Sequence, residues 1–163
     1  MPRFALDHNF PVQIISDVWP PSIELIRFGD IDPRMTEWDD WQIILELERR
    51  GGFDGLITDD GDMLAERNPM VALSRTSLSL VIADAAGHQP IKAAGLLMIY
   101  LQAIIANRPR GPSIFVLSVD EVGRKKRDIF ECIRRIARQE NVAEQDLRRA
   151  VNQDLDLWLE QDR

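Results

Sequence analysis

The chain has 163 residues, of which 45% are hydrophobic and 29% are charged, and its formal net charge is −7. This length and composition fit one globular domain with a sizeable core and exclude a disordered or fibrous chain. The acidic balance argues against a nucleic-acid binder that is basic throughout, although it leaves room for a local basic patch. Cys132 is the single cysteine, which excludes an internal disulfide and a cysteine-rich zinc site.

Two features of the sequence bear on its location in the cell. The chain opens without a charged and then apolar leader, and a single thiol suits a reducing compartment, so we expect a cytoplasmic protein. The longest uncharged, mostly apolar run covers residues 93–107 and is shorter than the roughly 20 residues that span a bilayer. We therefore expect no membrane contact and a helix that is buried or that packs on a second copy in a homodimer.

Short aliphatic runs alternate with longer amphipathic runs along the first 120 residues. The predicted elements, in chain order, are a strand at 3–6, a helix at 11–19, a strand at 22–28, a polar loop at 30–35, a helix at 40–50, a strand at 55–58, a helix at 63–72 that Pro69 interrupts, a strand at 78–83, a helix at 90–107 and a strand at 113–119. The helix at 40–50 has the clearest signals, because Asp39 or Asp40 can cap its start and Gly51 follows its end.

Strands that alternate with helices imply a parallel sheet with helices on both faces. We therefore predict an α/β fold with a five-stranded, mainly parallel sheet over residues 1–120. Two further helices, at residues 123–139 and 143–160, would form a C-terminal helical extension over residues 121–163.

Charge is unevenly divided within this extension. Residues 123–138 carry seven basic and two acidic side chains, whereas residues 139–163 carry three basic and seven acidic ones. The basic segment could supply local positive charge for a phosphate-containing partner. It could equally pair with the acidic end, either in the same chain or in a second copy, and the sequence leaves both readings open.

Four acidic residues stand at positions where chemistry in a parallel sheet takes place. Asp7 follows the first predicted strand, Asp60 and Asp62 follow the third, and Asp40 begins the helix after the second. Sites in open parallel sheets lie at the carboxyl ends of the strands, so we expect these side chains to share one cleft. Clustered carboxylates raise each other's pKa, and a hard cation such as Mg²⁺ or Mn²⁺ would relieve that cost. Each acid alone also has a local explanation as a cap or turn residue, so only their conjunction predicts a metal-binding α/β domain.

Three short motifs resemble those of compact PIN-like nucleases. Residues 6–11 read Leu-Asp-His-Asn-Phe-Pro, similar to the family's opening Leu-Asp-Glu-Asn-Leu-Pro. Residues 40–44 resemble its Asp-x-x-Ile-Leu helix start, and residues 58–63 resemble its Thr-x-Asp-x-Asp-Phe. The motifs occur in the same order and with the same spacing over residues 3–118. Two positions depart from the pattern, since His8 replaces Glu and Met63 replaces Phe; His8 could touch phosphate, act as a base or be a loop residue.

The resemblance implies a PIN-like nuclease domain at residues 1–120 that binds Mg²⁺ or Mn²⁺ and hydrolyses RNA, like the toxin ribonucleases of bacterial toxin–antitoxin pairs. Asp7 and Asp60 would be the principal metal ligands, and Asp40 and Asp62 would bind a second metal or orient the attacking water. The metal-activated water would attack in line and leave 5′-phosphate and 3′-hydroxyl ends.

Other residues gain expected roles from the same resemblance. Asn9 would donate a hydrogen bond that holds Asp7 in place, and Thr58 would support the ligands in the same way. An antitoxin-type protein would be a partner alongside the RNA substrate. The residues expected to contact RNA are the four consecutive bases Arg124, Lys125, Lys126 and Arg127.

Two alternatives stay open. A PIN-like scaffold without catalysis would only bind a partner protein, although four intact acids speak against it. A phosphoacceptor receiver domain also has five parallel strands and clustered acids, but it requires a lysine after the fifth strand, where this chain has Ser118. The sequence contains no Gly-x-Ser-x-Gly, Walker-type loop or Gly-x-Gly-x-x-Gly, so a serine nucleophile and a nucleotide cofactor lack support.

Overall fold

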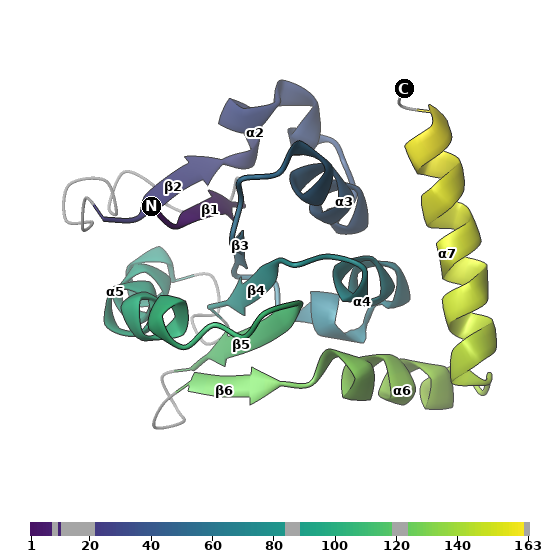
Figure 1. Ribbon diagram of the computed structural model, residues 1–163. Helices are drawn as coiled ribbons and strands as arrows, with labels where there is room; N and C mark the ends of the chain where they lie inside the picture. Colours follow the sequence, from purple (N-terminus) through teal and green to yellow (C-terminus); the bar gives the residue numbers. More distant parts are fainter. Residues whose placement is uncertain (8–9, 11–21, 84–88, 119–123, 162–163) are drawn as a thin grey trace.

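The structure of the chain is a computed structural model, and it describes residues 1–7, 10, 22–83, 89–118 and 124–161. At its centre lies a six-stranded sheet with the strand order β2-β1-β3-β4-β5-β6 (Figure 1). The strands are β1 (Arg3–Leu6), β2 (Glu24–Arg27), β3 (Gly55–Thr58), β4 (Ser79–Ile82), β5 (Ser113–Leu117) and β6 (Arg124–Arg127). The first five run parallel and β6 pairs antiparallel with β5.

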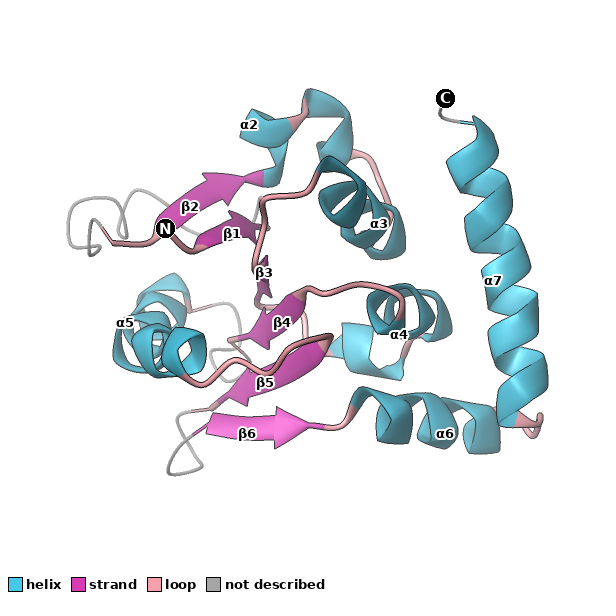
Figure 2. Cartoon of the chain, in the orientation of Figure 1, coloured by secondary structure: helices cyan, strands magenta, loops and turns pink. Residues whose placement is uncertain are grey.

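Helices cover both faces of this sheet (Figure 2). The helical segments are α2 (Phe28–Ile31), the 3₁₀ turn η1 (Pro33–Thr36), α3 (Asp40–Arg50), the 3₁₀ turn η2 (Asp62–Ala65), α4 (Arg67–Ser74), α5 (Pro90–Ala106), α6 (Ile129–Gln139) and α7 (Glu144–Gln161). The predicted α/β class, with a mainly parallel sheet between helices, is therefore confirmed. The helix expected at residues 11–19 lies outside the described residues.

The core is divided by the sheet into two apolar clusters, because successive residues of a strand point to opposite faces. Leu56 and Leu80 face the cluster beneath α3, α4 and α6, whereas Ile57 and Val81 face the cluster beneath α5. β3 also packs closely on β4: a Cβ added to Gly55 would lie 2.1 Å from the backbone oxygen of Ser79, which explains the glycine at the start of this strand.

The C-terminal segment corrects the predicted strand count. Residues 124–127, expected in a helix, form β6 and bring the sheet to six strands. Pairing with β5 overrides the helix propensity of these bases, because it covers an apolar edge strand that would otherwise be exposed. The helix then begins at Ile129, where the N-cap Asp128 Oδ1 accepts a hydrogen bond from the backbone N–H of Phe130 at 2.8 Å.

The helix predicted at residues 63–72, with an interruption at Pro69, is divided into η2 and α4, and the break lies at Glu66, earlier than expected. Pro69 is the physical reason, because a proline ring in a continuous helix would clash with the carbonyl four residues earlier, here that of Ala65. The chain is extended at Glu66, and α4 restarts with Pro69 in its first turn. Similarly, Phe28 begins the short helix α2 instead of ending a strand, and the expected polar loop contains α2 and η1.

The two C-terminal helices share the core beneath α3 and α4. Leu147, Val151 and Leu155 of α7 are buried in it. Further along α7, Trp158 packs edge-to-face against Trp38 and Trp41, with ring centroids 5.6 and 5.5 Å apart. α7 therefore reaches the start of α3, where the candidate site begins.

On the opposite face, α5 buries Leu97, Leu101 and Ile104 against the sheet and leaves Ile91 and Ile99 exposed. Within the part of the chain that the structure describes, no helix combines the length and apolar character needed to cross a membrane. The homodimer expected through this helix stays a prediction.

A buried acid in α3 stabilises the helix packing. The Glu46 side chain is fully buried and lies 2.5 Å from Arg49 Nη2 and 2.6 Å from Arg50 Nε. Arg50 also pairs with Asp32, at 2.6 Å, and so connects α3 to the start of η1. Burial raises the pKa of Glu46, but the hydrogen bonds from the two arginines outweigh burial and hold the pKa below its ordinary value.

We predict that Glu46→Gln lowers the free energy of unfolding at pH 7 by about 2 kcal/mol, because two arginines then lose their buried counter-charge. The loss should shrink as the pH falls below about 4, since a carboxyl with a depressed folded pKa contributes stability only above its unfolded pKa. Urea unfolding at several pH values measures this. Glu37→Gln, at an exposed position, is the matched control, and equal losses in both variants would contradict the prediction.

Candidate functional site

The strand order reverses at β1 and β3, and in open parallel sheets the ligand crevice lies at the carboxyl ends of the strands that flank such a reversal. From β1 the chain moves to β2 on one side and later returns to β3 on the other side of β1. Ligands of open α/β sheets bind at such a reversal of strand order. Asp7 directly follows β1, and Asp60 lies two residues after the end of β3, so both acids lie at this crevice.

Thr58 links these two acids. Its buried hydroxyl donates a hydrogen bond to Asp7 Oδ2 at 3.0 Å and accepts one from the backbone N–H of Asp60, also at 3.0 Å. Asp60 Oδ1 in turn accepts a hydrogen bond from the backbone N–H of Asp62 at 2.9 Å. One hydroxyl thus sets the position of the Asp60 loop relative to the Asp7 carboxylate.

Asp40 joins the same site from the first turn of α3. Asp39 is the N-cap residue, and its backbone N–H donates to Gln42 Oε1 at 2.8 Å. Burial, together with the negative charges of Asp7, Asp60, Glu66 and Asp39, raises the pKa of Asp40 to about 6. The shift therefore reflects first the burial of this carboxyl and then the negative charge of the neighbouring acids.

Glu66 is a site acid that the sequence analysis missed. Burial raises its pKa, and the charges of Asp60, Asp39 and Asp62 add to the effect. Glu66 fell inside the helix predicted at residues 63–72, before its interruption at Pro69, whereas it precedes α4 and lines the same hollow as Asp40. Pro69 signalled the interruption, but a proline is tolerated in the first turn of a helix, so the break lies before it, at Glu66.

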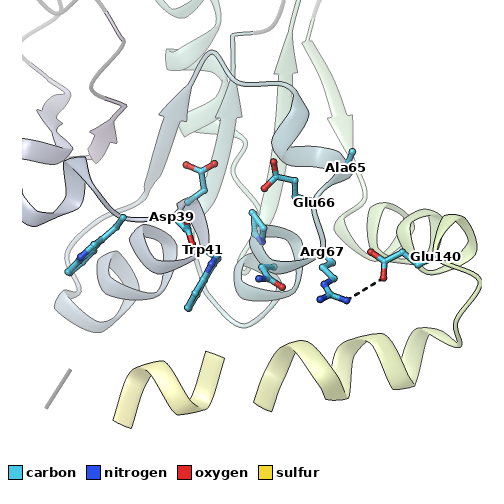
Figure 3. Close-up of a pocket in the computed structure, with 10 residues that line it drawn as sticks. Asp39, Trp41, Ala65, Glu66, Arg67 and Glu140 are labelled. Carbon is cyan, nitrogen blue, oxygen red and sulfur yellow. Dashed lines mark ion pairs between the residues drawn. The ribbon is translucent and has the colours of Figure 1, made fainter. Parts of the chain in front are cut away.

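A hollow of about 670 Å³ opens beside these acids (Figure 3). Arg67 and Glu140 form an ion pair at one wall, at 3.5 Å. Within the described residues, the buried side-chain oxygen of Asn68 has no hydrogen-bond partner. The hollow is lined by Trp38, Asp39, Asp40, Trp41, Ala65, Glu66, Arg67, Asn68, Pro69 and Glu140.

The chemistry of the site favours a hard cation. Carboxylate oxygens are the ligands that Mg²⁺ and Mn²⁺ prefer, and a cation would relieve the charge that raises the pKa of Asp40. As the side chains of the described residues stand, no three acidic, histidine or cysteine groups are close enough to hold one ion. A shared ion would therefore require the carboxylates to draw closer together.

The structure brings together three of the four predicted acids, namely Asp7, Asp40 and Asp60. Asp62 is exposed at the start of η2, and its charge acts on Glu66. His8 and Asn9 lie outside the described residues.

The four predicted RNA-contacting bases form β6, away from the 670 Å³ hollow. The backbone of all four residues is described, but side chains are described only for Lys126 and Arg127, which are exposed. These two line a second hollow together with α6.

Comparison with protein-family models, curated proteins and solved structures finds no match to this chain. The assignment of a site therefore depends on the geometry and chemistry of its own residues.

We predict that Thr58→Val destabilises the fold by about 1–2 kcal/mol, because the buried Asp7 carboxylate and the Asp60 N–H both lose a partner. Thr58→Ser keeps the hydroxyl and should retain most of the stability. Chemical unfolding of both variants measures the difference, and a Val variant as stable as the parent would show that these two hydrogen bonds do not stabilise the fold.

We predict that Asp40→Asn raises the free energy of unfolding at pH 8 by about 1 kcal/mol, after allowance for the partial exposure of this carboxylate. The gain should shrink as the pH falls below about 6 and disappear below about pH 4, because the cost of a raised folded pKa builds up between the unfolded and the folded pKa of the carboxyl. Thermal melts across this range test the prediction, with the exposed Asp154→Asn as control. A titration of Asp40 near pH 4, followed by NMR, would refute it.

Proposed function

We propose that this protein is a divalent-metal-dependent phosphodiesterase of PIN-like architecture that cleaves RNA internally with a metal-activated water. The observation that carries the proposal is the Thr58 bridge between Asp7 and the Asp60 loop at the reversal of strand order. It supports the proposal because carboxylates from β1 and β3, far apart in sequence, lie at one crevice. The three motifs that resemble compact PIN-like nucleases contain the same residues.

In this proposal the acids have distinct roles. Asp7 and Asp60 would hold the cation, and the Thr58 hydroxyl would keep their spacing. A bound Mg²⁺ or Mn²⁺ supplies charge neutralisation on the phosphate and lowers the pKa of a bound water. Asp40 would orient the attacking water and accept its proton.

One observation keeps a second function in view. The order β2-β1-β3-β4-β5 is also that of flavodoxin-like and receiver folds, so a phosphoacceptor domain would show the same arrangement. Ser118 follows β5 where a receiver requires lysine, which favours the nuclease. Incubation with acetyl phosphate followed by mass spectrometry separates the two, since only a receiver would retain a phosphoryl group on an aspartate.

We predict that Mn²⁺ or Mg²⁺ raises the melting temperature. At ten times the dissociation constant the stabilisation is about 1.4 kcal/mol, or roughly 3–6 °C for a chain of this size. Asp60→Asn should abolish the shift, and Asp154→Asn on α7 should keep it. A shift of the same size in Asp60→Asn would mean that the metal binds elsewhere, and no shift in the parent protein would favour a non-catalytic scaffold.

We also predict metal-dependent cleavage of a mixed RNA pool by the purified protein. Asp7→Asn and Asp40→Asn should each lower the rate by about 10²-fold or more, because each removes a group that acts on the metal or the water. The Asp154→Asn variant should cleave like the parent. Cleavage that persists unchanged in Asp7→Asn would refute the assignment of the site.

A further inference from the structure

A second hollow, of about 360 Å³, lies between the end of β6 and one side of α6. Four of the residues that line it are basic, namely Lys126, Arg127, Arg135 and Arg138, and two are acidic, Asp128 and Glu131, so the lining carries a net positive charge. We call the four basic residues the cationic cleft. Cationic clefts concentrate positive potential because their low-dielectric walls focus the field.

The positive charge of the cationic cleft is only partly neutralised inside the protein. Glu131 is shared between Arg134, at 2.7 Å, and Arg138, at 3.0 Å. Arg135 donates to the backbone oxygen of Leu64 at 3.1 Å, a neutral partner that leaves its charge unbalanced. Lys126 and Arg127 are exposed, and among the described residues neither forms an ion pair.

This distribution argues against the view that the basic segment is balanced by the acidic C-terminal end. In α7, Glu144 and Asp146 pair with Arg148 and Arg149 of the same helix. Two acids of the C-terminal end therefore form ion pairs within α7 itself. The cationic cleft remains accessible to an external anion.

The cationic cleft adjoins the candidate site through α6. Arg135 contacts Leu64 in η2, the turn that begins with Asp62. At the other end of the same helix, Glu140 lines the acidic hollow and pairs with Arg67. One short helix thus borders both the cationic cleft and the acids.

We propose that the cationic cleft binds the sugar–phosphate backbone of single-stranded RNA and delivers that strand to the acidic crevice. The inference rests on the proposed function, because an acidic crevice repels RNA and requires a nearby cationic surface to retain it. A protein partner is disfavoured, since the cores of protein interfaces are apolar and poor in lysine. A short, all-basic edge strand also resists the addition of a further strand.

The test measures binding without cleavage, in the Asp60→Asn background with EDTA. A fluorescein-labelled single-stranded RNA of about 12 nucleotides is titrated at about 0.1 M salt, and its anisotropy is recorded. The double variant Lys126→Glu/Arg127→Glu is compared with Lys92→Glu/Arg110→Glu, two exposed bases on α5 and in the loop before β5. Both pairs change the net charge equally.

We expect the cleft variant to raise the dissociation constant at least tenfold and the control variant to change it by less than about threefold. The slope of log K against log salt should fall by about 1.4 in the cleft variant, the value for two lost phosphate contacts on a single strand. Equal effects in both double variants, no effect in either, or competition by polyglutamate as effective as that by RNA would each overturn the inference.

Two further measurements distinguish an error in the proposed RNA-binding surface from an error in the proposed nuclease function. Melting curves, together with the milder Lys126→Gln/Arg127→Gln variant, show whether lost binding reflects lost folding. If the parent cleaves RNA in an Asp40-dependent way and the cleft variant binds and cleaves as well as the parent, the cleft inference is wrong and the nuclease stands. If the cleft variant loses binding but the parent never cleaves RNA, the nuclease is wrong and the RNA-binding surface stands.

Discussion

The hydroxyl of Thr58 is the contact on which the candidate site depends. A hydroxyl can donate and accept at once, and here it donates to Asp7 and accepts from the backbone of Asp60. It can do so because β1 and β3 are neighbours in the sheet. The loop after β3 is thereby held beside the end of β1. The remaining acids of the site add their charge to a pair of carboxylates, Asp7 and Asp60, whose relative position this hydroxyl fixes.

Two acids on α3, the buried Glu46 and the partly buried Asp40, show how strongly the surroundings decide the state of a carboxylate. Glu46 is fully buried, yet Arg49 and Arg50 compensate its charge, so its pKa stays low and it contributes to packing. Asp40 is partly buried among other acids and, within the described residues, has no basic partner to compensate it in this way, so burial and the neighbouring charges raise its pKa. Clustered carboxylates lower the stability of the fold, and such a loss is most readily retained where a bound ligand compensates it. We therefore infer a functional role for Asp40 and a structural role for Glu46.

The C-terminal segment contributes to the fold and to the surroundings of the site. β6 closes the apolar edge of the sheet, and α6 ends beside the acidic hollow, where Glu140 pairs with Arg67. α7 packs Trp158 on the two tryptophans that line the hollow. Residues after the fifth strand therefore shape both the acidic hollow and the cationic cleft next to it.

The sequence by itself determined the α/β class, the helix at Asp40–Arg50 and the positions of the acids near strand ends, because periodicity, caps and glycines act locally. Tertiary structure decided what depends on neighbours distant in sequence. Arg124–Arg127 became a strand because β5 offered an open edge, and Glu66 joined the site because folding brings it near Asp39 of the α3 N-terminus. The pKa of Asp40 likewise reflects acids from three other segments, whose proximity no local pattern encodes.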